Sequence, residues 1–214
     1  MMLNALVIHN HIEGLTPLYQ SNDQVHYDFA YVSKDFDPNL DPYELLIVPC
    51  GSDHLAMLKI KNKVKAFLDQ GKALFCFDGW FTDWIPGNRW IMNNEKKTID
   101  VRYHIEDDPH SLFEGIDLDQ FNFSNGISGW WACGYIEPAS EATVLLADTW
   151  DRPMLVLDEA STSGTMILTA SGPLADKTYA TTDDFSSEKG LAKLYHQFLT
   201  YVIQKQNKRQ LLQA

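Results

Sequence analysis

Short apolar runs bounded by polar loop residues dominate the amino-terminal half of the chain. The runs at residues 3–8 (LNALVI), 44–48 (ELLIV) and 72–77 (KALFCF) are apolar at all but one position each. Such runs are typical of strands buried on both faces, as in a parallel sheet that is covered by helices. Residues 26–33 (HYDFAYVS) are rich in aromatic side chains and predict one more strand.

Residues 54–70 predict an amphipathic helix between two of these strands. Ser52 or Asp53 can accept hydrogen bonds from its first backbone N–H groups, and Gly71 supplies a left-handed stop. Strand, helix and strand together make a βαβ unit with a right-handed crossover. The apolar positions that recur at helical spacing are Leu55, Leu58, Val64, Phe67 and Leu68.

The carboxyl-terminal half also alternates strands with a helix. A turn cluster containing Gly164 separates the last two strand candidates and predicts a hairpin. A helix is expected from Ser186 or Ser187 to about residue 206, and a structured loop with short helical pieces at residues 79–94. The four strand candidates are residues 98–105, 142–147, 154–158 and 165–170.

This alternation predicts an α/β fold: a three-layer sandwich with a mostly parallel, flavodoxin-like central sheet and helices on both faces. One domain is expected over residues 1–214, with the tryptophan-rich segment around residues 79–94 as an insertion loop. In such folds the binding site lies outside the carboxyl ends of the strands. The segments expected at this rim are residues 9–14, 49–54, 78–88, 104–110 and 171–182.

Charge and composition narrow the choice of partner. Lys and Arg number 17 against 29 Asp and Glu, which gives a formal charge of −12 and disfavours nucleic acid and anionic membranes. The chain carries no apolar run of about 18 residues and no paired cysteines, so a cytoplasmic protein is expected. Neither GxGxxG nor GxxxxGK[ST] occurs, and no cofactor is predicted.

The order of these pieces resembles the class I glutamine amidotransferase-like superfamily, which includes the ThuA-like group. The resemblance rests on residues 43–51 (YELLIVPCG), on the helix that ends in Gly71-Lys72, and on residues 73–80, where that superfamily carries its nucleophile elbow. It covers about residues 1–90. It implies a cysteine on a sharp strand-to-helix turn, a histidine and a glutamate as partners, and, through the ThuA-like group, a link to carbohydrate metabolism.

Residue by residue, the resemblance places other groups at the positions of this triad. Asp78 falls where the cysteine belongs, and Gly172 falls where the histidine belongs. Cys76 precedes Asp78 by two residues, so it points back into the sheet and is expected to be an inert core thiol. The usual Cys-His-Glu route to glutamine hydrolysis is therefore not expected here.

Asp78 is the leading candidate for a site residue. A carboxylate at this bend can anchor a ligand hydroxyl or act as a general base, and the alternative is that it only caps its own turn. Cys50 is a candidate nucleophile near a helix amino terminus, with His54 or His9 as its base; the alternative is a small, partly buried residue. The backbone N–H groups of Cys50 and Gly51 are placed to stabilise negative charge.

The remaining candidates are aromatic, acidic or histidine side chains at the expected rim. Trp80 and Trp84 offer flat faces to a ligand, and core packing is the alternative. Histidines and carboxylates at residues 9–11 and 104–110 could bind a metal, but their spacing fixes no geometry and no metal site is predicted. The candidate ligand-binding residues are His9, Gly51, Trp80, Asp83, Trp84 and His110.

Three functions are compatible with these observations. The leading hypothesis is a protein that binds a small polar or sugar-like molecule on an amidotransferase-like fold, or a hydrolase-like enzyme on that fold. The alternatives are a Cys50-dependent amidase or hydrolase and a non-catalytic oligomerisation or interaction module. Whether the protein is an enzyme stays open at this point, and so does whether it forms a homodimer.

Overall fold

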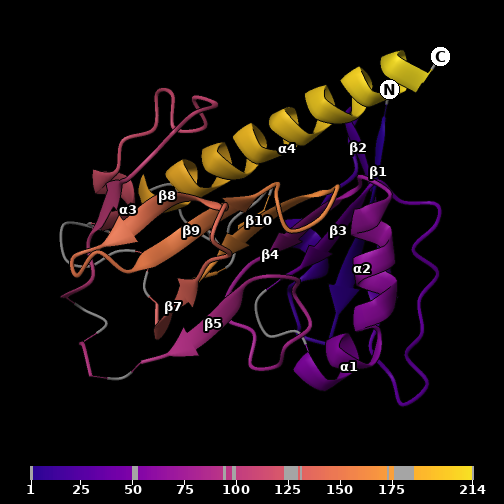
Figure 1. Ribbon diagram of the computed structural model, residues 1–214, viewed down its shortest axis with the longest axis horizontal. Helices are drawn as coiled ribbons and strands as arrows, with labels where there is room; N and C mark the ends of the chain where they lie inside the picture. Colours follow the sequence, from indigo (N-terminus) through magenta and orange to yellow (C-terminus); the bar gives the residue numbers. More distant parts are fainter. Residues whose placement is uncertain are drawn as a thin grey trace.

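A computed structural model describes residues 2–49, 53–93, 95–97, 100–122, 130, 132–172, 174–175 and 186–213. Its centre is an eight-stranded sheet with the order β2-β1-β3-β4-β10-β9-β8-β6 (Figure 1). These strands are β1 (Leu3–His9), β2 (Val25–Tyr31), β3 (Leu45–Val48), β4 (Ala73–Cys76), β6 (Tyr103–Ile105), β8 (Thr143–Asp148), β9 (Pro153–Asp158) and β10 (Thr165–Thr169). A separate two-stranded sheet pairs β5 (Arg89–Met92) with β7 (Gly134–Glu137).

The central sheet divides into a parallel part and an alternating part. β1 to β4 and β10 run in one direction, with β10 beside β4. β9 pairs antiparallel with β10, β8 with β9, and β6 with β8. The predicted mostly parallel sheet and the predicted hairpin, which is β9–β10, are both confirmed.

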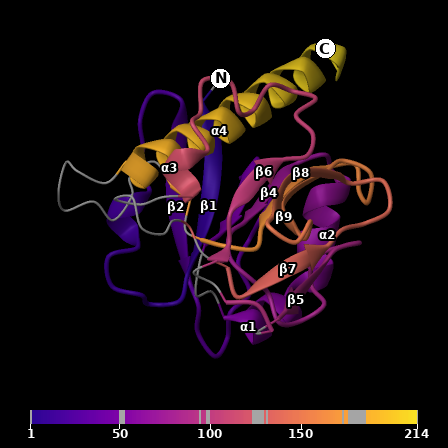
Figure 2. The same cartoon turned by 90° about the vertical axis from the view of Figure 1, so that its left-hand side faces the viewer.

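Helices cover both faces of the sheet, as predicted, and Figure 2 shows α4 and α2 on opposite sides of it. On one face, α4 (Ser186–Gln213) packs Tyr195 and Phe198 against Phe75, with ring centroids 6.1 and 6.2 Å apart. The 3-10 turn η1 (Thr16–Leu18) precedes Tyr19, which lies on this same face against Tyr195. Burial of these apolar side chains supplies most of the stabilisation of such a core.

The other face is covered by α1 (His54–Lys59) and α2 (Lys61–Asp69). One continuous helix was expected here, but Ile60, with φ −97° and ψ 10°, interrupts it. The predicted ends are correct: the Asp53 carboxylate accepts hydrogen bonds from the amides of Leu55 and Ala56 at 2.9 and 3.0 Å, and Gly71 has a φ of +82°.

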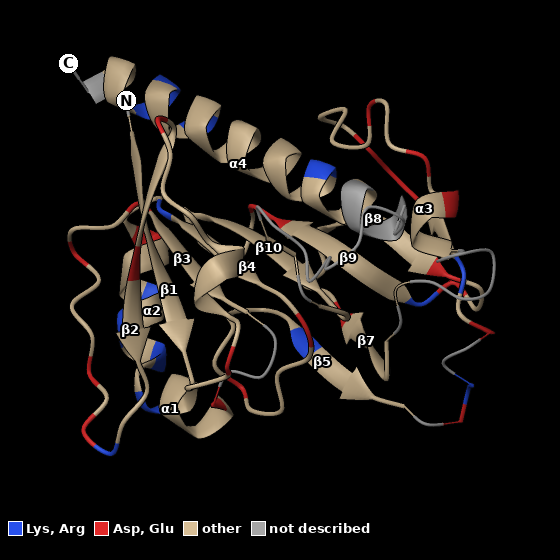
Figure 3. Ribbon diagram, turned by 180° about the vertical axis from the view of Figure 1, so that it is seen from behind, with Lys and Arg blue, Asp and Glu red and all other residues tan. Residues whose placement is uncertain are grey.

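The tryptophan-rich loop differs from its prediction. Among its described residues it holds the strand β5 and no helix, because Arg89–Met92 pairs with β7, a strand that the sequence pattern did not indicate. Another short helix, α3 (Asp119–Asn122), lies against α4. None of the described helices is long and apolar enough to cross a membrane. Figure 3 marks Lys and Arg positions along α2 and α4, whereas Asp and Glu positions are spread over many loops.

Candidate functional site

The carboxyl ends of the parallel strands meet at one rim of the sheet. From β1 the chain crosses to β2 at the sheet edge, and from β2 it returns past β1 to β3. The direction of the connections therefore switches between β1 and β3, and this is where doubly wound α/β sheets form a crevice. The strand ends at this rim are His9, Tyr31, Val48, Cys76 and Thr169.

Asp78 lies just beyond β4 in a strained backbone conformation. Its φ is +73°, a value that costs a non-glycine residue on the order of 1 kcal/mol or more. Its amide donates to the Ser171 carbonyl at 3.1 Å and to Thr169 Oγ1 at 3.2 Å, so the exit of β10 holds the turn in place. Its Oδ1 accepts from the Gly79 amide at 2.8 Å, which is the capping contact weighed above.

The residue after Asp78 fits only without a side chain. A Cβ atom on Gly79 would lie 2.3 Å from Cε2 of Trp90, and one on Gly134 would lie 2.6 Å from Cζ2 of the same ring. The indole of Trp90 thus occupies a slot between two glycines, one on the Asp78 turn and one on β7. This slot ties the turn to the two-stranded sheet.

His54 opens α1 next to this turn. Its Nδ1 accepts from the Phe81 amide at 3.4 Å, and its ring meets the Phe81 ring edge-on at a centroid distance of 4.8 Å. Burial lowers the pKa of His54, against the opposing influence of the Asp78 and Asp53 carboxylates. His54 is therefore a neutral imidazole at neutral pH that carries its proton on Nε2.

An open hollow of about 540 Å³ lies at the strand switch point, and Asp53, the chain neighbour of His54, is part of its lining. Its lining comes from the segments that follow β1 and β2 and from the residue that caps α1. Cys50 and Gly51, which were predicted at this place, lie outside the described residues. The lining residues are Asn10, His11, Val32, Ser33, Lys34 and Asp53.

Comparison with known proteins identifies the fold. The sequence matches no protein-family model and no curated protein. Among solved structures, a cytoplasmic protein from Salmonella typhimurium LT2 is 10% identical with a TM-score of 0.61, and the match covers 94% of this chain and 99% of that one. A putative ThuA-like protein from Parabacteroides merdae is 12% identical with a TM-score of 0.56 over 95% of this chain and 90% of that one.

A glutamine amidotransferase from Thermotoga maritima also matches, at 9% identity and a TM-score of 0.54, over 80% of this chain and 76% of that one. The chain has the glutamine amidotransferase-like fold. The resemblance drawn from the sequence is therefore confirmed for the fold, which includes the ThuA-like proteins. Identities this low establish architecture alone, so the chemistry has to be argued from the residues of this chain.

His9 does not offer its ring to a ligand, contrary to expectation. It is 6% exposed, its Nδ1 accepts from the His11 amide at 2.9 Å, and its Nε2 lies 3.4 Å from Thr16 Oγ1. Burial, and then the neighbouring His11, lower its pKa. Both ring nitrogens thus have hydrogen-bond partners in the segment that follows β1, so His9 holds this part of the rim in place instead of contacting a ligand.

Trp80 and Trp84 are core residues, which corrects the prediction that they present ring faces to a ligand. Each is 2% exposed, and their indole N–H groups have no hydrogen-bond partner within the described part of the chain. Apolar burial outweighs the cost of these unpaired donors. Asp83 is exposed and lines a separate hollow against Lys61 and Lys65 of α2.

His110 lies at the opposite end of the sheet from Asp78, and its predicted place at the rim is wrong. Its ring stacks on Tyr201 of α4 at 4.6 Å, and its Nε2 is 3.9 Å from the Glu159 carboxylate. Glu159 contacts Thr165, where β10 begins. The reason is the direction of β6, which runs against β4 and carries the chain away from the rim.

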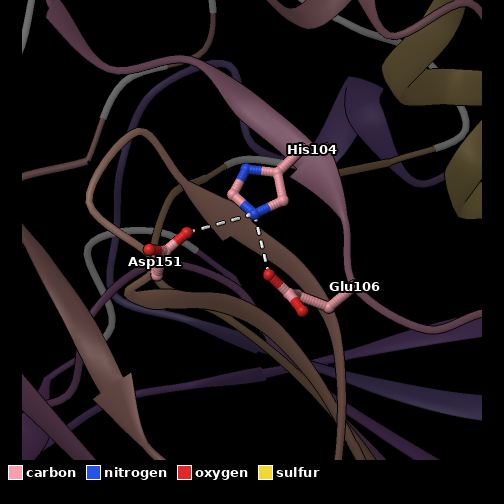
Figure 4. A group of neighbouring side chains, drawn as sticks. All are labelled: His104, Glu106 and Asp151. Atoms are coloured by element: carbon pink, nitrogen blue, oxygen red, sulfur yellow. Dashed lines mark hydrogen bonds and ion pairs between the residues drawn. The ribbon is translucent and has the colours of Figure 1, made fainter.

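One group among the described residues has the donor atoms for a metal ion. His104 Nε2 lies 2.7 Å from Glu106 Oε1 and 3.5 Å from Asp151 Oδ1 on the edge strand β6 and the turn after β8 (Figure 4). All three side chains are well exposed to solvent. Exposed acidic groups beside a histidine are common without a metal ion, and the group lies off the Asp78 turn.

Sequence reasoning missed Phe81, Thr169 and the partner glycine Gly134. Phe81 is an exposed aromatic ring at the rim, at 61% exposure, although its hydrophobicity alone predicts burial. Thr169 ends a predicted strand, and that position was the available signal.

Cys76 is buried as predicted: burial and the Asp78 carboxylate raise the pKa of its thiol well above the ordinary value.

Proposed function

We propose that this rim binds a small polar molecule of carbohydrate type and that Asp78 is its anchoring carboxylate. The observation that carries the proposal is the strained turn, which holds Asp78 just beyond the carboxyl end of a central strand. Unfavourable backbone conformations persist where the surrounding structure over-determines them, and they cluster at functional sites. Here the exit of β10 supplies that restraint through two hydrogen bonds to the Asp78 amide.

The neighbouring groups suit a ligand rich in hydroxyl groups. An ionised carboxylate accepts hydrogen bonds from hydroxyls, and a neutral His54 with its proton on Nε2 supplies a donor. The formal charge of −12 favours a neutral or cationic ligand over an anionic one. If the ligand is turned over, Asp78 is the group that takes a proton, with the reaction class being hydrolysis.

The test is Asp78→Asn in a thermal-shift screen over sugars, sugar acids, amino acids and divalent ions. Asn tolerates a positive φ and keeps an oxygen for the Gly79 amide, so the melting temperature should stay within about 3 °C of wild type. A ligand well above its Kd raises the melting temperature of wild type, and the substitution should abolish that rise.

Asp151→Asn is the matched control. Asp151 also has a positive φ, of 57°, but it follows β8, three strands away from β4 in the sheet. It should therefore respond to sugars, sugar acids and amino acids like the wild type; divalent ions are left out of this comparison, because Asp151 belongs to the His104 group. If Asp78→Asn retains the full ligand response, Asp78 is not the anchor and the proposal fails.

A further inference from the structure

An exposed aromatic ring stands beside the Asp78 turn in a fixed orientation. The ring of Phe81 meets His54 at 4.8 Å with an interplanar angle of 87°, and it meets Trp90 at 4.9 Å with an angle of 77°. Edge-to-face contacts of this kind are favourable aromatic geometry. Two rings thus support Phe81 from the protein side, although 61% of its surface remains exposed.

The support itself is rigid. Trp90 is 9% exposed, and Gly79 and Gly134 enclose its indole. His54 is held on the other side, because its Nδ1 accepts from the Phe81 amide and its carbonyl accepts from Thr82 Oγ1 at 2.9 Å. A ring that is already ordered loses little conformational entropy when a ligand packs on it.

We propose that Phe81 is the stacking platform of this site and that it selects ligands with an apolar ring face and hydroxyls at the edge, namely pyranose sugars and cyclitols. The proposal rests on the proposed function and adds the feature that discriminates between ligands. C–H groups on one face of such a ring pack on Phe81, while its hydroxyls reach the carboxylate of Asp78 and the imidazole of His54.

The polar surroundings favour this ligand class over an apolar protein partner. His54 accepts a hydrogen bond from the Phe81 amide and another from Thr82, and Asp53, the chain neighbour of His54, lines the adjoining hollow. A planar anionic aromatic packed beside His54 would be repelled by two carboxylates, Asp53 and Asp78, whose charges both act on this imidazole. A neutral ring with hydroxyl groups avoids that repulsion.

The experiment measures binding of methyl glucoside, methyl galactoside, methyl mannoside and myo-inositol by calorimetry and by saturation-transfer NMR. Phe81→Ala and Phe81→Leu should each weaken the tightest of these complexes by about tenfold, the order expected for one lost aromatic contact. Phe81→Trp should bind at least as tightly as wild type. Leu keeps the apolar character but removes the flat ring, so it separates stacking from general hydrophobicity.

Met92→Ala is the matched control, since Met92 is another exposed apolar side chain, two residues beyond Trp90 on β5. It should bind as wild type does. If the wild type binds none of the four probes, or if Phe81→Leu binds them as tightly as the wild type does, Phe81 is not a stacking platform. The proposed function fails separately: if Phe81→Ala weakens binding but Asp78→Asn does not, the platform stands and the anchor is wrong.

Discussion

Gly79→Ala should lower the melting temperature of the protein distinctly, because there is no space for the new methyl group. It would lie 2.3, 2.5 and 2.6 Å from three carbons of the Trp90 indole, closer than side-chain Cβ atoms approach other atoms. The indole cannot retreat toward β7, since a Cβ on Gly134 would already lie 2.6 Å from the same ring. The substitution therefore tests whether the Trp90 slot is as tight as its geometry indicates.

The magnitude follows from this confinement. Overpacking a well-packed core costs about 1–3 kcal/mol, and a ring enclosed on two sides places Gly79→Ala near 3 kcal/mol. For a domain of this length, 1 kcal/mol changes the melting temperature by roughly 2–4 °C, so a decrease of about 10 °C is expected. Gly14→Ala provides the comparison, because Gly14 has a φ of +84° but nothing within 4 Å of an added Cβ. It should cost about 1 kcal/mol from backbone strain alone.

Urea unfolding of a double-mutant cycle checks the mechanism. Trp90→Leu removes both rings of the indole and costs stability by itself, but it makes space for the methyl group of Gly79→Ala. The double variant should be at least about 1 kcal/mol more stable than the sum of the two single effects predicts, and Gly14→Ala should show no such coupling to Trp90→Leu. Additive effects at Gly79 and Trp90 would refute the steric argument.

Two further predictions concern the thiol of Cys76 and the carboxylate of Glu159. Iodoacetamide near neutral pH should modify the exposed Cys133 but should react with Cys76 only after unfolding. The reason is that Cys76 is buried and that burial raises the pKa of its thiol. Peptide mass spectra that show rapid labelling of Cys76 in the folded protein would contradict this. Burial alone would raise the pKa of Glu159, but hydrogen bonds from Lys205 and Tyr201 lower this pKa overall. The ionised Glu159 therefore stabilises the folded protein fully above the unfolded-state pKa of about 4.3. This stabilisation is lost as the pH falls through the lower pKa of the folded state. Glu159→Gln should therefore cost up to about 1 kcal/mol at pH 7 and progressively less below about pH 4 in urea unfolding, whereas a gap independent of pH would count against this.

Local patterns were sufficient to predict the central sheet. The apolar runs at residues 44–48 and 72–77 contain β3 and β4, and the run at residues 3–8 covers all of β1 except its last residue, His9. Such runs suit strands that are covered on both faces. The Asp53 cap and the left-handed conformation of Gly71 could be predicted from the sequence, because each depends on a few neighbouring residues. These elements carry their information within one turn or one strand.

Features that depend on distant pairing were not readable from the sequence. Trp90 faces Ile136 across the two-stranded sheet, and the partners lie more than 40 positions apart in the chain. Without that pairing nothing indicates that Gly79 and Gly134 enclose one indole, or that Trp80 and Trp84 turn into the core while Phe81 turns out. A cluster of aromatic residues gives the composition of a site but not which ring is exposed.

The change of strand direction between the neighbouring strands β10 and β9 explains where the candidate site lies. Loops that follow strands reach the same rim only if the strands are parallel, and this holds for β1 to β4 and β10 but not for β9 and β6. β4 has a parallel neighbour on each side, so the turn at Asp78 receives Thr169 and Ser171 from one neighbour and His54 from beyond the other. The turn at Asp78 thus lies where the ends of three strands, β3, β4 and β10, come together, which suits a compact ligand rather than an extended chain.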